Sequence, residues 1–343
     1  TKTVMNKLTL VIPGLLGPFP ELQQGQSLVI NCPVLEKWLA CGQLKRTTGS
    51  GYFTLLADLL GINHDYDLTS VSALTDGYEC LKTGCLRADP VHFKTDIDHA
   101  ILIDHHQLLI QDYEAEALVD VFNNHFFDDG IELHIGHTHR WYLSSDNDFT
   151  IESTALPEAV GRNVQHFLPR GADALNWKRI LNETQMLFHT HEVNQQREAK
   201  GQLTINSLWL WGEGQTLRQQ GKNNWQWVYA DDEIAEGLAH WAELKHRSLD
   251  QLNIANNLPE GNGVIVLDQL LGPVSYGDLD AWVDAVEALC QQWLPGIHAQ
   301  LKTRKITFLD IYFADGRYLS LTPGQLYKFW RRKKPVSDYL SAE

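Results

Sequence analysis

KLTLVIPGLLGP, residues 7–18, begins with the apolar run 8–12, which a Pro-Gly pair then breaks. A short apolar run that ends in this way predicts a buried strand followed by a turn. Two amphipathic segments come next, CPVLEKWLACG (residues 32–42) and GYFTLLADLLG (residues 51–61), and each of them ends at a glycine. A buried strand followed by amphipathic helices that glycines close predicts an α/β core.

The pattern changes at about residue 84. Short runs of alternating, β-branched and aromatic residues follow, with the helical segment DYEAEALVDVFNNHF (residues 112–126) among them. Alternation with period two predicts strands, so we expect a compact α+β insert domain over residues 84–155.

Apolar strands and helices resume after the insert. LNWKRILNETQMLFHTHEVNQQREAKG (residues 175–201) predicts a long helix with a glycine just beyond its end. SLWLWGEG (residues 207–214) and GVIVLDQL (residues 263–270) predict further strands, and residues 305–321 predict a hairpin turning at Asp-Gly. We therefore expect a mainly parallel sheet with helices on both faces, built from residues 1–83 and 156–343.

Composition excludes several classes of partner. The chain has 343 residues, of which 43% are hydrophobic, and a formal charge of −15. This charge argues against a nucleic-acid partner, because such proteins display a concentrated basic surface. The one basic run, residues 331–334, is expected to be a solvated end, with a polyanion patch as the alternative. No stretch approaches the ~20 apolar residues of a membrane span, and we expect no membrane association.

The five cysteines are sparse and odd in number, which does not suit a disulfide framework. We therefore expect reduced thiols and a cytoplasmic protein. The cysteines at positions 80 and 85 lack a second close pair, so a zinc site is not expected there. The cysteine positions are Cys32, Cys41, Cys80, Cys85 and Cys290.

Fifteen histidines raise the question of a metal site. They gather in DHHQ (residues 104–107), HIGHTHR (residues 134–140) and HTH (residues 189–191). No converging carboxylates or thiolates complete a donor set, so surface or hydrogen-bonded histidines are expected instead of a metal centre. Arginines suit phosphate or carboxylate and would form an anion pocket if they converged, and each alone suits an ion pair. The candidates are Arg87, Arg140, Arg162 and Arg197.

GSGYF, residues 49–53, places Ser50 between two glycines before a helix. A helix entry of this kind stabilises an oxyanion or phosphate in some proteins. The stretch matches neither Gly-x-Ser-x-Gly nor a P-loop, so spacing alone favours an ordinary helix start.

The order of these segments resembles that of the archaeal-type cofactor-independent phosphoglycerate mutases, members of the alkaline phosphatase superfamily. The resemblance implies an alkaline-phosphatase-like core, and Ser50 then occupies the place of the nucleophile. Two family patterns, LNExxxxxHxxLxxHPVNxxRxxxG and ANxxLxRGxG, are similar to residues 181–201 and 205–214, where Trp211 stands in place of an arginine. RADPVH, RWYL and NSLWxWG also resemble a smaller bacterial group described as phosphoglycerate-mutase-like or regulatory. The polar residues retained on matching segments are Arg87, Asp89, Arg140, Asn194, Arg197 and Asn206.

Departures from the family decide the functional expectation. The reaction needs two divalent metals, commonly manganese or zinc, held by aspartates and histidines. The first aspartate position holds Pro13, Gly51 follows Ser50 where the family has an aspartate, and Tyr276 stands where a later histidine is expected. We therefore expect no bound metal and a catalytically degenerate protein that binds a ligand, such as a small phosphorylated metabolite, or a regulatory protein partner.

Two alternatives remain open. One is an active phosphoglycerate mutase or phosphatase with a rearranged manganese or zinc site that uses Ser50. The other is a regulatory interaction module whose exposed tryptophans dock a partner, because Trp and Arg dominate interface hot spots. The retained polar residues and Trp211 line an anion pocket in one interpretation, and in the other they hold the insert against the core.

Overall fold

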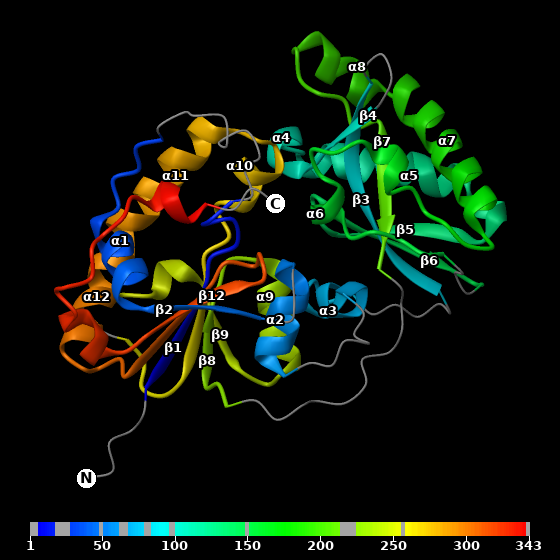
Figure 1. The fold of residues 1–343 in the computed structure, drawn as a ribbon. Coiled ribbons are helices and arrows are strands. Elements are labelled where there is room, and N and C mark those ends of the chain that lie inside the picture. Colours follow the sequence, from blue (N-terminus) through cyan, green and yellow to red (C-terminus); the bar gives the residue numbers. More distant parts are fainter. Residues whose placement is uncertain are drawn as a thin grey trace. The chain divides into compact units, whose positions relative to one another are not determined.

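The computed structural model describes residues 6–17, 28–47, 51–61, 68–78, 84–95, 100–147, 151–212, 224–254 and 258–340. The chain forms two compact units (Figure 1). Unit 1 combines residues 1–64 with residues 219–343, and unit 2 is the continuous stretch 65–218.

Unit 1 is an α/β sandwich around a seven-stranded sheet in the order β2-β12-β11-β1-β10-β8-β9. The five strands from β11 to β9 run parallel, and β12 and β2 add an antiparallel edge. The strands are β1 (Lys7–Val11), β2 (Gln43–Arg46), β8 (Trp227–Tyr229), β9 (Lys245–Arg247), β10 (Gly263–Val266), β11 (Phe308–Tyr312) and β12 (Arg317–Leu321). The mainly parallel sheet expected from the apolar runs is confirmed.

Helices cover both faces of this sheet, as Figure 1 shows. One group packs with Leu8 and Leu10 of β1 in a large apolar core, and α2 packs against α9. The helices of unit 1 are α1 (Pro33–Cys41), α2 (Tyr52–Leu60), α9 (Glu233–Trp241), α10 (Leu271–Ser275), α11 (Leu279–Gln292) and α12 (Leu294–Lys302). The predicted hairpin is also present, and Gly316 has a φ of +82° in its turn.

Unit 2 is an α+β fold on a five-stranded sheet in which every pairing is antiparallel. Its longest strand pairs in turn with three others along its length. The strands are β3 (Gly84–Thr95), β4 (Ala100–Ile103), β5 (Ile131–His137), β6 (Arg140–Ser145) and β7 (Ser207–Trp211). The helices are α3 (Leu68–Thr75), α4 (His105–Leu108), α5 (Asp112–His125), α6 (Leu156–Ala159), α7 (Ala174–Thr190) and α8 (Glu192–Ala199). The residues of α5, α7 and alternate strand positions share one apolar core.

The insert is larger than the predicted 84–155. The boundaries lie at 64/65 and 218/219, so α7, α8 and β7 belong to unit 2 and not to the α/β core. The reason is a long-range pairing, because β7 adds to the sheet of unit 2 beside β3, with Arg87 opposite Trp211. The long helix is also divided, since His191 is extended and its ring accepts a hydrogen bond from Val193 N as α8 begins.

The expectation of reduced thiols is wrong for one pair of cysteines. Cys32 and Cys290 form a disulfide across 258 positions of sequence, between the start of α1 and the body of α11. Cys41 and Cys85 are free and buried, and Cys80 lies outside the described residues. A pairing over this distance leaves no mark in local cysteine spacing. None of the helices in the described part of the chain is long and apolar enough to cross a membrane.

Candidate functional site

The carboxyl ends of the parallel strands in unit 1 lie along one edge of the sheet. Ligands of open α/β sheets bind outside the carboxyl ends of the strands. Pro13 follows β1 here, Asp232 follows β8, Asp268 follows β10 and Asp315 follows β11. Asp315 is held by Arg317, whose Nε lies 2.7 Å from its carboxylate.

The turn after β1 is closed by packing. Gly14 has a φ of +82°, and a Cβ at this position would lie 2.8 Å from Val274 Cγ2. The indole Nε1 of Trp282 donates to Gly14 O at 2.8 Å. The position where the resemblance implies the first metal-binding aspartate is therefore a buried proline in a tightly packed turn.

Three ionisable side chains lie close enough at this edge to interact electrostatically; we call Tyr52, Asp232 and Asp268 the edge cluster. Burial, followed by the charge of Asp268, raises the pKa of Asp232 from its ordinary value of 3.8 to about 7. Burial and the charges of Asp232 and Asp268 raise the pKa of Tyr52 well above its usual range. The carboxylate of Asp232 also caps α9, because Ala235 N donates to its Oδ1 at 2.7 Å.

The raised pKa of Asp232 predicts a pH dependence of stability. The folded state retains a proton that the unfolded state has lost between about pH 4 and about pH 7, so the free energy of unfolding should fall as pH rises through this window. Asp232→Asn keeps the cap and removes the charge, so urea unfolding should show a smaller fall and higher stability at pH 8. Asp278→Asn, at the exposed cap of α11, is the control. Equal slopes in the Asp232 variant and the unvaried chain would contradict this assignment.

The donors at this edge do not fit a pair of divalent metals held by aspartates and histidines. The edge cluster offers two carboxylates and a phenol. In the described part of unit 1, the ring of His246 contacts Ala230 O at 3.0 Å and that of His298 accepts from Trp38 Nε1 at 3.0 Å, while His240 lies exposed on α9. None of these three histidines joins a group of three metal-binding side chains.

Ser50 lies outside the described residues. Its neighbour Gly51 has a φ of +103° and donates from its backbone N to Ala314 O at 3.1 Å. The first turn of α2 is thus tied to the carboxyl end of β11.

Several candidate ligand residues of unit 2 come together, and they bind one another. Arg87 and Asp89 lie on one face of β3 and form a bidentate pair, with Nε to Oδ1 at 3.0 Å and Nη2 to Oδ2 at 2.9 Å. Trp211 donates from Nε1 to Asp89 Oδ2 at 2.7 Å, and its ring lies 5.0 Å from the Arg87 guanidinium. All three residues are at most 2% exposed. Alternation along β3 is the local signal for the Arg87–Asp89 pair.

Arg140 is held in the same way by a residue that the sequence analysis did not single out. Its guanidinium forms a bidentate pair with Asp76, which follows α3, with Nε to Oδ2 at 2.9 Å. The hydroxyl of Tyr142 also donates to Asp76 Oδ2 at 2.6 Å, and the Tyr142 ring lies 5.7 Å from the Arg87 guanidinium. Burial raises the pKa of Tyr142 far above its usual range. One continuous and largely buried network therefore joins α3 to β3, β6 and β7. We call its six residues the polar network: Asp76, Arg87, Asp89, Arg140, Tyr142 and Trp211.

Asn194, Arg197 and Asn206 form separate clamps in unit 2. Asn194 bonds the backbone of Ile205 in both directions at 2.8 Å, and Asn206 does the same for Phe93 at 2.7 and 3.1 Å. Arg197 donates to Glu114 Oε2 at 2.6 Å and to the carbonyls of residues 108 and 203. The remaining candidate arginine, Arg162, is exposed beside the ring of Phe167.

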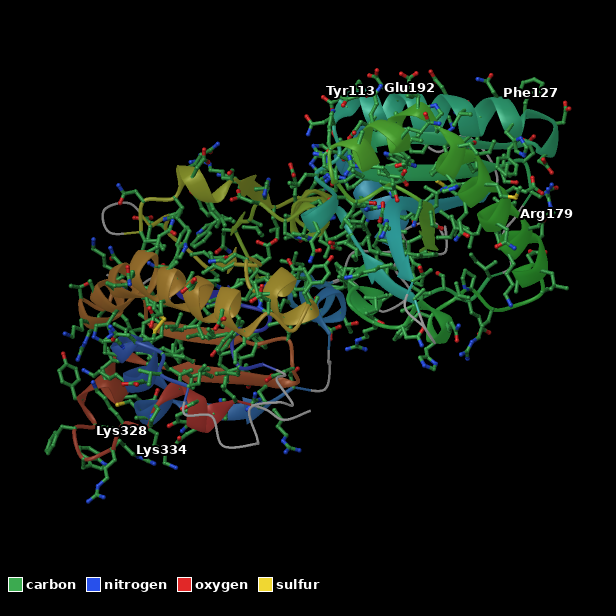
Figure 2. All side chains as sticks on the ribbon, turned by 90° about the horizontal axis from the view of Figure 1, so that it is seen from above. Tyr113, Phe127, Arg179, Glu192, Lys328 and Lys334 are labelled. Atoms are coloured by element: carbon green, nitrogen blue, oxygen red, sulfur yellow. A yellow bond between two sulfur atoms is a disulfide. The ribbon has the colours of Figure 1, made fainter. Side chains whose placement is uncertain are left out.

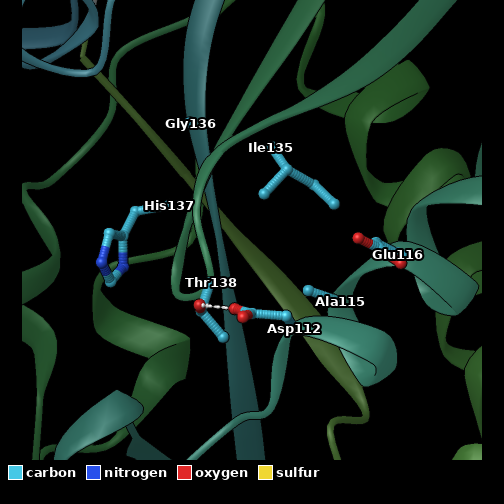
Figure 3. A pocket seen from close by; sticks show the side chains of 7 residues that line it. All are labelled: Asp112, Ala115, Glu116, Ile135, Gly136, His137 and Thr138. Atoms are coloured by element: carbon cyan, nitrogen blue, oxygen red, sulfur yellow. Dashed lines mark hydrogen bonds between the residues drawn. The ribbon is translucent and has the colours of Figure 1, made fainter.

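Histidines and carboxylates gather around a groove of about 430 Å³ between the start of α5 and the turn joining β5 to β6. Figure 3 shows the hydroxyl of Thr138 bonded to Asp112, with Glu116 beyond and His137 on the other side of the strand. Close by in sequence and space, the side chains of Asp104, His105 and His106 offer ligand atoms within 4.8 Å of one another. The sequence shows both histidine groups and gives no sign that they meet.

A second surface feature lies in residues 327–334 of unit 1. Most tryptophans are in the cores, but Trp330 is 65% exposed and Phe329 is 92% exposed. Residues 331–334, all basic and all exposed, follow directly. Figure 2 shows Lys328 and Lys334 on the same side of unit 1. We call residues 327–334 the aromatic-basic segment.

No family model matches this chain. Solved structures show similarity of fold. A cofactor-independent phosphoglycerate mutase of Thermoplasma acidophilum has a TM-score of 0.48 and 16% identity, covering 98% of this chain and 94% of that one. A protein of Pyrococcus horikoshii has a TM-score of 0.51 and 14% identity, covering 93% and 87%.

Sequence similarity is confined to part of the chain. A stretch of 134 residues is 27% identical to a 2,3-bisphosphoglycerate-independent phosphoglycerate mutase of Methanosarcina mazei, covering 38% of this chain and 34% of that protein. A stretch of 131 residues is 28% identical to such a mutase of Methanothermobacter thermautotrophicus, covering 37% and 32%. The matched stretches thus span about a third of the length of these curated relatives. Over 38% of its length, this chain is similar in sequence to archaeal cofactor-independent phosphoglycerate mutases.

Proposed function

We propose that this protein is a catalytically degenerate relative of the phosphoglycerate mutases that acts by binding a ligand or a protein. The edge cluster carries this proposal. A pair of divalent metals needs several anionic and imidazole ligands to offset the loss of hydration. In the described part of unit 1, this edge of the sheet offers Pro13 in a packed turn and the carboxylates of Asp232 and Asp268, and none of the described histidines of unit 1 joins a group of three metal-binding side chains. We derive no metal-dependent step from this donor set.

The polar network supports the same proposal. An arginine that binds a phosphate presents its guanidinium fork to the ligand. The forks of Arg87 and Arg140 are taken by Asp89 and Asp76, and that of Arg197 by Glu114. These residues hold strands and helices of unit 2 together, which favours the structural interpretation of the retained residues over an anion pocket.

The test is turnover of 3-phosphoglycerate with excess Mn²⁺ or Zn²⁺. We expect no mutase or phosphatase activity above that of buffer with metal. The assay is run on the full chain and on a His105→Ala/His106→Ala variant. These two histidines offer metal-binding atoms outside the edge cluster, so removing them restricts the number of metal ions counted per chain to the other sites. Turnover that Ser50→Ala abolishes, with two ions retained per chain in the histidine variant, would overturn the proposal.

The aromatic-basic segment supports a second candidate function, docking of a partner with an acidic surface. The segment is strongly basic in a chain of net charge −15, and its exposed Phe329 and Trp330 resemble the anchors of interface hot spots. Phe329→Ser/Trp330→Ser should abolish recovery of a stoichiometric, salt-sensitive partner from native lysate. The control is Phe127→Ser, which removes an aromatic side chain 81% exposed on unit 2. Equal recovery by both variants would remove this candidate.

A further inference from the structure

Four imidazoles and one carboxylate meet on unit 2, outside the edge cluster and the polar network. Asp104, His105 and His106 lie where β4 leads into α4, and His137 and His139 lie at the turn between β5 and β6. The ring of His105 stacks on that of His139, with centroids 4.1 Å apart and an interplanar angle of 10°. We call these five residues the histidine cluster.

Asp104 anchors the cluster. It is 5% exposed, and its Oδ1 caps α4 by accepting from His106 N at 3.1 Å. The other oxygen, Oδ2, lies 2.9 Å from His106 Nδ1 and 3.8 Å from His105 Nδ1. One carboxylate oxygen therefore serves the helix, and the other faces two imidazole nitrogens.

These separations suit a shared cation. Zinc binds imidazole nitrogen and carboxylate oxygen at about 2.0–2.2 Å, which places neighbouring ligands of a tetrahedral site about 3.4 Å apart. The two distances from Asp104 Oδ2 lie on either side of this value. Small side-chain rotations of His105 and His106 would bring all three atoms onto one ion.

The crowding of the rings points in the same direction. His137 and His139 approach with their Nδ1 atoms 3.1 Å apart, while His105 contacts both His106 and His139 at centroid distances of 4.1 Å. These ring contacts hold the imidazoles of His105, His106 and His139 together beside the Asp104 carboxylate.

We propose that Asp104 Oδ2, His105 and His106 bind one divalent ion of the zinc class. Imidazole with carboxylate favours Zn²⁺, Co²⁺ or Ni²⁺ over Mg²⁺ and Ca²⁺, which prefer oxygen ligands. Three protein ligands leave a fourth position for water or a ligand atom. His139 stacks on His105, and His137, which contacts His139, also lines the groove that contains Asp112 and Glu116.

The experiment measures metal binding by the full chain after treatment with EDTA. Titration with Co²⁺ should give the visible absorption of a low-coordinate site at one equivalent, and Zn²⁺ should displace it. His105→Ala/His106→Ala should abolish the signal. Asp104→Asn preserves the cap of α4 and should weaken metal binding at least about tenfold. A loss of about tenfold is typical when a residue that only hydrogen-bonds to a metal ligand is mutated, so loss of a ligand should cost at least as much. His166→Ala/His189→Ala, which removes two exposed histidines outside the cluster, should bind like the unvaried chain.

The opposite results are equally clear. Absence of a bound ion, or unchanged affinity in the His105→Ala/His106→Ala variant, would overturn the proposal. Binding that is lost only in His137→Ala/His139→Ala would also overturn it. Circular dichroism in EDTA establishes that each variant is folded. The readout is binding, so its result is separate from that of the phosphoglycerate assay.

Discussion

Asp89→Ala should lower the free energy of unfolding by about 3–5 kcal/mol, because it leaves the buried guanidinium of Arg87 without its counter-charge. Arg87 is 2% exposed, so water does not replace the lost carboxylate. Trp211 Nε1 loses its acceptor in the same substitution. The loss is a large fraction of the about 5–15 kcal/mol by which a domain is stable. Urea unfolding followed by tryptophan fluorescence measures it.

Two comparisons isolate the cause. Arg87→Met/Asp89→Asn removes both charges and leaves an amide oxygen for Trp211, so it should recover most of the lost stability. Asp129→Ala removes one of the two acidic partners of Arg179, from a pair whose side chains are 44% and 38% exposed, and should cost less than about 1 kcal/mol. A loss from Asp89→Ala as small as that from Asp129→Ala would show that Arg87 reaches solvent.

Breaking the disulfide should produce the second large effect. Cys290→Ala should reduce the stability of unit 1 by about 2–4 kcal/mol relative to the oxidised chain. The bond joins segments 258 positions apart, so its loss frees a very long loop in the unfolded state. Urea unfolding with and without reductant measures the difference.

Reductant provides the internal control for this bond. Stability of the unvaried chain should fall in reductant to that of Cys290→Ala, and the variant should be unaffected. Cys41→Ala removes a free buried thiol and should keep the sensitivity to reductant. A chain whose stability is the same in both conditions would contradict the pairing of Cys32 with Cys290.

Local pattern predicted much of unit 1. The apolar run 8–12 overlaps β1 and the run 263–270 contains β10, and these two strands pair in parallel. The glycines after α1 and α2 mark the ends of these helices. These features depend on periodicity and turn chemistry over a few residues. The extent of unit 2 depends instead on β7 pairing with β3 across more than a hundred residues, and no local signal records that pairing.

The candidate site shows the same limit. Arg87 and Asp89 stand two apart on a strand, so their contact is predictable from alternation alone. The partner of Arg140 is Asp76, which comes from a different element, and the histidine cluster joins α4 to the turn after β5. Residue type therefore identified the polar candidates. The tertiary fold determines which residues contact them: it pairs the arginines with carboxylates and brings the histidines together.

The position of β1 has a consequence for how the molecule is made. β1 is synthesised before unit 2, yet both of its neighbours in the sheet, β10 and β11, follow unit 2 in the chain. Unit 2 is continuous and complete by residue 218. Because domains fold as units during translation, we expect the inserted unit to fold first while the nascent β1 waits unpaired for its partners.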